Sequence, residues 1–275
     1  MAVTQVDYPE LAVKAAESVL LELVSILGEY LDHIVLIGGM VPKYLVKSAE
    51  EDHVGSTDID LALDHRRFDE PGYQTIHKLL EKQDYRKDAE QPFIYRRNFV
   101  IDGNAITVQV DLLSGEYGGT GKSRRTQKVQ DVRPRKARGA DMAFDDPVYV
   151  KITGDLPGGA KDTATIRVAA IVPFIVMKAM AMRDRLKQKD PYDIYYCLQY
   201  FPGGIDEIAE SFRLFKGNKL VEEALGILSE KFNSPEHVGP AHITEFLEIT
   251  DTYDAELTKR DAFERVQYLV ERCSE

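Results

Sequence analysis

The spacing of apolar residues predicts an alternation of helices and strands over the first part of the chain. Apolar side chains recur at helical spacing over residues 11–31, and an apolar run at 34–37 predicts a short buried strand over 33–37. Residues 58–63 alternate between polar and apolar, which predicts a half-buried strand. A glycine pair after the first strand predicts a turn into a helix at 40–47, and Pro42 is tolerated in its first turn because no intrahelical donor is needed there.

The middle of the chain predicts a β-hairpin. Two β-type runs at 93–101 and 105–113 are joined by Asp102-Gly103-Asn104, a strong turn signal. A helix is predicted before them at 73–83, and a further strand after them at 148–152.

The pattern becomes mostly helical from residue 173 onward, with breaks that contain glycine, proline or asparagine. The breaks lie at 202–204, 217–218 and 235–240. The sequence therefore predicts an α+β domain at 1–165 and a helical domain at 166–275.

Composition narrows the class of protein. Hydrophobic content of 44% and charged content of 29% are typical of a soluble globular protein. No apolar stretch approaches the roughly 20 residues of a membrane span, and the first ten residues lack the pattern of a signal peptide. Cys197 and Cys273, the two cysteines, lack metal-ligand spacing. We therefore expect a cytoplasmic protein without a membrane partner.

One basic segment interrupts an acidic chain. The formal net charge is -11, yet residues 114–140 hold eight basic and only two acidic side chains. This segment, Lys122 to Arg138, suggests a dedicated contact with an anion such as RNA. A solvated surface loop explains the same composition equally well.

Two aspartates one residue apart are the first candidate for chemistry. Asp58 and Asp60 have the spacing that places two side chains on one face of a strand, so they can hold one cation together. A solvent-facing aspartate pair is the alternative, but aspartate disfavours strands and this pair follows a glycine turn. Asp111, at the predicted end of a later strand, would add a third carboxylate if the two strands are neighbours, or would be a turn residue.

A second block lies at the start of the helical region. Lys178 stands on an apolar helical face, where a compact cation suits a phosphate oxygen. Asp190 before Pro191 has the pattern of an N-cap, with Asp193 completing a capping-box-like pair. Capping and orienting Lys178 are compatible roles for Asp190. Lys189 has the pattern of a surface charge.

These motifs together resemble the DNA-polymerase-β-type nucleotidyltransferase superfamily. The resemblance rests on Gly38-Gly39, Asp58-Ile59-Asp60 and Asp111. The block from Lys178 to Tyr195 is similar to that of the abortive-infection toxin group, AbiEii/AbiGii. The fold that this implies is an α+β nucleotidyltransferase fold, a mixed sheet with flanking helices, followed by a C-terminal helical domain. One departure is Gly39, where much of the toxin group has serine.

The resemblance implies a site and a reaction. The implied catalytic residues are Asp58, Asp60, Asp111 and Asp190, of which the first three would bind Mg²⁺ as cofactor. The implied nucleotide-binding residues are Gly38, Gly39, Ser56, Thr57 and Lys178. The reaction would move an NMP from an NTP to an acceptor hydroxyl, with an RNA or tRNA 3′ end as acceptor and an antitoxin as partner.

Two other functions remain open at this point. One is transfer to a small molecule, as in antibiotic nucleotidyltransferases. The other is nucleotide binding without catalysis by an interaction protein.

Overall fold

The structure is a computed structural model that describes residues 3–47, 50–67, 74–117 and 125–274. Contacts between Cα positions group the chain into two units. The sheet unit comprises Pro9–Val41 and Gly55–Ala170, and the helical unit comprises Met1–Tyr8, Pro42–Val54 and Ile171–Glu275. The predicted domain boundary at residue 165 stays a prediction, because this grouping of contacts does not test it.

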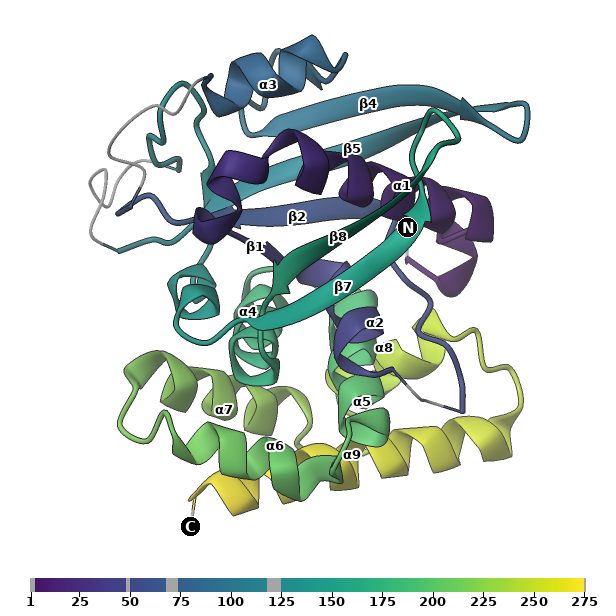
Figure 1. The fold of residues 1–275 in the computed structure, drawn as a ribbon. Helices are drawn as coiled ribbons and strands as arrows, with labels where there is room; N and C mark the ends of the chain where they lie inside the picture. The colour runs from purple at the N-terminus through teal and green to yellow at the C-terminus, as the bar shows by residue number, and fades with distance from the viewer. Residues whose placement is uncertain (1–2, 48–49, 68–73, 118–124, 275) are drawn as a thin grey trace. The chain divides into compact units, whose positions relative to one another are not determined.

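The sheet unit is built on a mixed sheet of eight strands among the described residues. The strand order is β3-β4-β5-β2-β1-β8-β7, and β6 pairs with β5 (Figure 1). The strands are β1 (Ile34–Ile37), β2 (Asp58–Leu63), β3 (Arg86–Lys87), β4 (Ile94–Ile101), β5 (Asn104–Ser114), β6 (Arg135–Lys136), β7 (Val148–Asp155) and β8 (Lys161–Val168).

The short strand β1 forms at the centre of this sheet because its apolar residues are buried there. All four residues of β1 are buried, which suits a strand covered on both faces. It pairs antiparallel with β2 and parallel with β8, and β2 in turn pairs parallel with β5. The predicted strands at 33–37 and 58–63 and the hairpin of β4 and β5 are confirmed.

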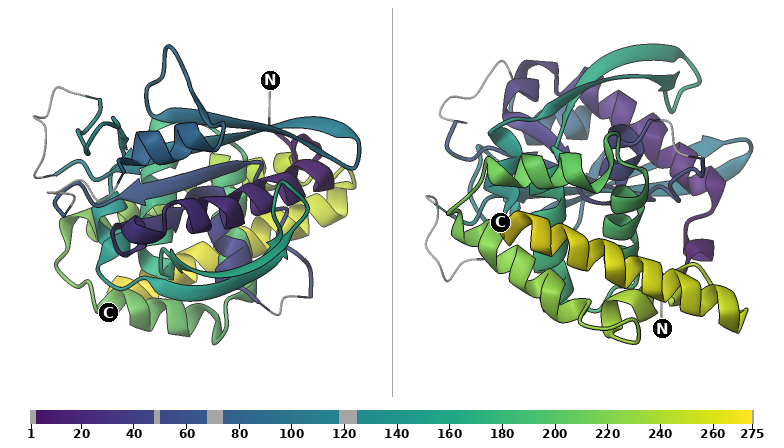
Figure 2. Two further views of the ribbon diagram at one scale, coloured as in Figure 1. Left: turned by 45° about the horizontal axis from the view of Figure 1, so that its top comes forward. Right: turned by 90° about the horizontal axis from the view of Figure 1, so that it is seen from below.

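Helices and 3₁₀ turns flank the sheet within the same unit. The longest, α1, lies across one face of the sheet (Figures 1 and 2) and buries Leu20 and Leu23 completely or nearly so. Gly28 begins a 3₁₀ segment, so α1 is shorter than the predicted helix at 11–31. The elements are α1 (Glu10–Ile26), η2 (Gly28–His33), η3 (Gly38–Met40), α3 (Ile76–Lys82) and η4 (Ala140–Phe144).

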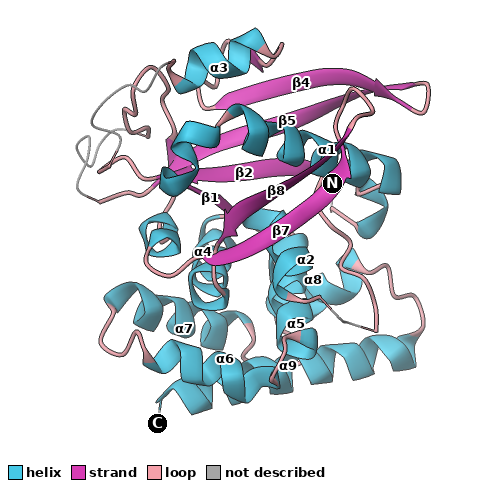
Figure 3. Ribbon diagram, viewed as in Figure 1, coloured by secondary structure: helices cyan, strands magenta, loops and turns pink. Residues whose placement is uncertain are grey.

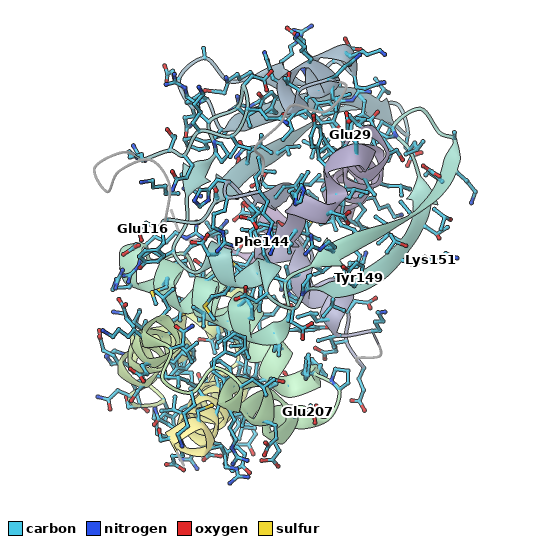
Figure 4. All side chains as sticks on the ribbon, turned by 60° about the vertical axis from the view of Figure 1, so that its left-hand side comes forward. Glu29, Glu116, Phe144, Tyr149, Lys151 and Glu207 are labelled. Atoms are coloured by element: carbon cyan, nitrogen blue, oxygen red, sulfur yellow. The ribbon has the colours of Figure 1, made fainter. Side chains whose placement is uncertain are left out.

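The strand β7 shows the alternation of a half-buried edge strand. Val150 and Ile152 are buried, whereas Tyr149 and Lys151 are exposed (Figure 4). Its partner β8 was not predicted, because its first residues are polar and mostly not buried. An exposed lysine on a sheet edge discourages pairing with another chain.

The helical unit contains the C-terminal helices, drawn in cyan in Figure 3. Its core includes Phe174, Phe232 and Phe246, all fully buried. Among the helices in the described ranges, none combines the length and the apolarity that crossing a membrane requires. The helices are η1 (Gln5–Asp7), α4 (Ile171–Asp184), α5 (Lys189–Tyr200), α6 (Gly204–Arg213), α7 (Lys219–Lys231), α8 (Val238–Phe246) and α9 (Thr252–Ser274), and α2 (Val41–Leu45) begins at the boundary of the two units.

Candidate active site

Three aspartates share one face of the sheet. In the parallel pair of β2 and β5, Asp58 lies beside Gln109 and Asp60 lies beside Asp111. Because side chains two positions apart on a strand point to the same face, all four side chains lie on that face. Asp111 was predicted at the end of its strand, but β5 continues to Ser114, so the alternative that Asp111 is a turn residue is wrong.

The electrostatics of Asp111 reflect this crowding of negative charge. Burial raises the pKa of Asp111 to about 6, and the negative charges of Asp60 and Asp58 act in the same direction. The hydrogen bond that Gln109 donates, at 2.9 Å, and the positive charge of Arg135 oppose the shift. A cation between these carboxylates would relieve their repulsion.

The donor atoms of this face fit Mg²⁺. Carboxylate oxygens are its preferred protein ligands, and it usually takes one or two of them together with substrate phosphates and water. Across the ranges that the structure describes, no three His, Cys, Asp or Glu side chains form a ready-made metal-binding group. The assignment of Asp58, Asp60 and Asp111 as metal ligands is therefore a proposal, which we take up below.

The glycine turn touches the same face. Ile37, the last residue of β1, lies beside Asp60, and Gly38 follows it with a φ of +77°. A Cβ atom at Gly38 would lie only 2.7 Å from the Cγ of Asp60, so this position requires glycine both for its backbone angle and for space. Gly39 is buried in the 3₁₀ turn that follows.

Ser56 and Thr57 stand directly before β2. Ser56 is buried and Thr57 is partly exposed. Their predicted contacts with a nucleotide stay predictions, as does that of the glycine pair.

The helical unit holds a separate cluster of buried charges, in which Lys178 on α4 faces two aspartates of α5. The Nζ atom of Lys178 lies 2.8 Å from Asp190 Oδ1 and 2.6 Å from Asp193 Oδ2. Arg185 donates to both oxygens of Asp190, at 2.9 and 3.1 Å. Burial alone would raise the pKa of Asp190, but the positive charges of Lys178 and Arg185 outweigh burial and lower it.

This cluster corrects two predictions. The helix α5 begins at Lys189 with Gln188 as its N-cap, so Asp190 lies inside the first turn and does not cap the helix. Lys189 is not a surface charge, because it is buried and its Nζ lies 2.5 Å from Asp193 Oδ1. Asp190 accepts a hydrogen bond from Lys178, a contact that is compatible with its second predicted role of orienting Lys178. The predicted contact of Lys178 with a nucleotide phosphate, and a catalytic role of Asp190, stay predictions.

His53 belongs to the same cluster and was not singled out in the sequence, because no motif surrounds it. Its Nε2 atom lies 3.0 Å from Asp193 Oδ1, and its ring stacks on Tyr192 and meets Tyr196 edge to face. Burial and the positive charge of Lys189 together lower the pKa of His53 to about 4, against the opposing hydrogen bond with Asp193. The imidazole is therefore neutral at pH 7.

The basic segment is described only in part, since Lys122 and Arg124 lie outside the described residues. Arg125, Lys128 and Arg133 are exposed, which suits an anion contact, and buried residues such as Val129 and Val132 alternate with them. Binding to RNA stays a prediction.

Comparison with known proteins identifies the family. A family model described as "Nucleotidyl transferase AbiEii toxin, Type IV TA system" matches residues 22–265, which is most of the chain. No curated protein and no solved structure gives a significant match. The matched range includes the glycine turn, all three aspartates of the sheet face and the Lys178 cluster. The chain therefore belongs to the AbiEii family of nucleotidyltransferase toxins of type IV toxin–antitoxin systems.

Proposed function

We propose that this nucleotidyltransferase moves an NMP from an NTP to an acceptor hydroxyl with Mg²⁺ as cofactor, and that the acceptor is an RNA end such as the 3′ end of a tRNA. The observation that carries the proposal is the register that sets Asp60 beside Asp111, with Asp58 on the same face. The exposed cations Arg125, Lys128 and Arg133 support an anionic acceptor. Membership in the family supports a cognate antitoxin as partner.

The residues of the sheet face have distinct roles in this proposal. Asp58, Asp60 and Asp111 would hold the ion, which when bound stabilises the negative charge that develops on the transferred phosphate. The acceptor oxygen bonds to the α-phosphorus while the bond from that phosphorus to the leaving pyrophosphate breaks. Asp111 would also accept the proton of the acceptor hydroxyl as a general base.

The experiment incubates the purified protein with each α-³²P-labelled NTP, Mg²⁺ and total RNA. We expect D58N and D60N to lose label transfer by on the order of 10²-fold or more, since metal stabilisation of the transition state is worth several kcal/mol. The matched control is D102N, an aspartate-to-asparagine change in the turn between β4 and β5, where φ is +51° and asparagine is tolerated.

Two results would contradict the proposal. Full label transfer by the double variant D58N/D60N would refute the role of the aspartates. Label that appears in a small-molecule fraction and never in RNA would refute RNA as the acceptor, while leaving the reaction type intact.

A further inference from the structure

Arg135 lies on the same face of the sheet as the three aspartates. The strand β6 pairs parallel with β5, and Arg135 lies beside Leu113. Since Leu113 is two positions after Asp111, its side chain and that of Arg135 share the face of Asp111. Strand spacing and rise place the Cα atoms of Arg135 and Asp111 about 8 Å apart, within the reach of an extended arginine side chain.

The guanidinium of Arg135 is held by an aromatic ring. It lies over the ring of Phe93 at 5.5 Å, and Phe93 directly precedes Ile94, the neighbour of Asp111 on β4. A cation at this distance from the face of a ring is attracted by the ring electrons, which favours a position of the guanidinium near Phe93 and Asp111.

The hydrogen-bonding capacity of Arg135 is not used up within the described residues. Its Nε atom is buried and has no hydrogen-bond partner there, and no carboxylate forms an ion pair with its guanidinium in those same ranges. Its positive charge acts on Asp111 without cancelling the effect of burial and of the other aspartates. A buried donor without a partner costs stability unless a ligand supplies an acceptor.

A phosphate chain offers the anionic oxygen acceptors that the buried Nε–H donor of Arg135 lacks among the described residues. Planar guanidinium groups bind phosphate oxygens through two parallel hydrogen bonds, which a lysine cannot reproduce. Arg135 is only partly exposed and stands beside the carboxylate face, whereas the exposed cations Arg125, Lys128 and Arg133 suit a large acceptor. Position therefore favours the nucleotide over the acceptor as the ligand of Arg135.

We propose that Arg135 binds the triphosphate of the NTP substrate and holds the oxygens that leave as pyrophosphate. This inference rests on the proposed function, because it requires an NTP at the face of Asp58, Asp60 and Asp111. It adds a phosphate-binding residue that the motifs of the sequence did not indicate.

The test compares R135Q, R135K and the control R86Q, which removes an exposed arginine from β3 of the same sheet. For each we measure the KM for the preferred NTP, the KM for RNA, and the calorimetric affinity for tripolyphosphate with Mg²⁺, a probe that is independent of the base. We expect R135Q to weaken NTP and tripolyphosphate binding by about 10- to 100-fold, the range for a lost charged hydrogen bond, with the KM for RNA unchanged. R135K should be intermediate, and R86Q should keep the affinity of the wild type for both phosphate ligands.

The outcomes separate this inference from the proposed function. Wild-type protein that transfers no label from any NTP would refute the proposed function and, with it, the inference. Active wild-type protein together with an unchanged NTP KM in R135Q would overturn the inference alone. A raised KM for RNA with an unchanged KM for NTP would also overturn it and would assign Arg135 to the acceptor. If thermal denaturation shows that R135Q does not fold, R135K decides in its place, and an NTP KM equal to that of the wild type overturns the inference.

Discussion

The buried histidine of the helical unit leads to a quantitative prediction about acid stability. His53 is neutral in the folded chain first because it is buried, and then because of the positive charges of Lys189 and Lys178, which together with burial outweigh the favourable contact with Asp193. Protonating this inaccessible imidazole would add a further positive charge to the buried cluster. The pKa of His53 is accordingly lowered from 6.5 to about 4.

The sign of the effect follows from proton binding. Between pH 6.5 and pH 4 the unfolded chain binds a proton at His53 that the folded chain does not bind. The contribution to stability is therefore fully present above pH 6.5 and is lost as the pH falls toward 4. With about 1.4 kcal/mol for each unit of pKa, His53 lowers the free energy of unfolding by about 2 kcal/mol between pH 7 and pH 4.5.

The assay is urea denaturation followed by circular dichroism at a series of pH values from 7 to 4.5, for the wild type and for H53Q. Glutamine keeps an N–H donor for Asp193 but does not titrate. Asp111, whose pKa is raised, acts in the opposite direction, since its contribution is lost as the pH rises through about 6. That effect is common to both proteins, so the difference between them isolates His53.

We expect the wild type to lose about 2 kcal/mol more stability than H53Q over this interval. The control is H242Q, which removes a partly exposed imidazole from α8 of the same unit. Parallel pH profiles for the wild type and H53Q would refute the reasoning, because they would mean that the folded chain protonates His53 as readily as the unfolded chain.

The glycine turn and the basic segment each provide a further prediction. Gly38 and Gly103 have nearly the same positive φ, so G38A and G103A should each lose about 1–2 kcal/mol of stability in urea denaturation from backbone strain. Only at Gly38 does the added Cβ also collide with Asp60. G38A should therefore lose nucleotidyl transfer while G103A retains it, and equal activities would contradict the role of the turn. Replacing Arg125, Lys128 and Arg133 by glutamine should weaken RNA binding and reduce the slope of log K against log salt by about 0.7 for each lost phosphate contact. The control is K151Q/K161Q on the hairpin of β7 and β8, and an equal loss in both variants would argue against a dedicated RNA contact.

Most of the local structure was predictable because it depends on neighbours in sequence. The strand at Asp58–Leu63 matched its alternation of polar and apolar residues, and the hairpin of β4 and β5 matched its turn residues. The strand β8 was not predicted because its first half is polar and mostly unburied. Its extended conformation depends instead on pairing with β7 and β1.

The errors at the charged residues have one physical cause. Lys189 has the pattern of a surface lysine, and Asp190 before Pro191 has the pattern of a cap. Burial of a charge becomes tolerable only when a partner of opposite charge is in contact with it. The partners Asp193 and Lys178 are set by the packing of α4 against α5, which the local pattern does not reveal.

The sequence by itself indicated the family and the candidate residues of this protein. The glycine pair, the aspartate pair and the block from Lys178 to Tyr195 resemble the motifs of the AbiEii family, to which the family model assigns the chain. Spacing along a strand also fixed that Asp58 and Asp60 share a face. Only the tertiary structure decided that Asp60 lies beside Asp111, that Arg135 shares their face, and that His53 is buried against Asp193. Strand register and the burial of charge join residues that are distant in sequence, so they depend on the whole fold.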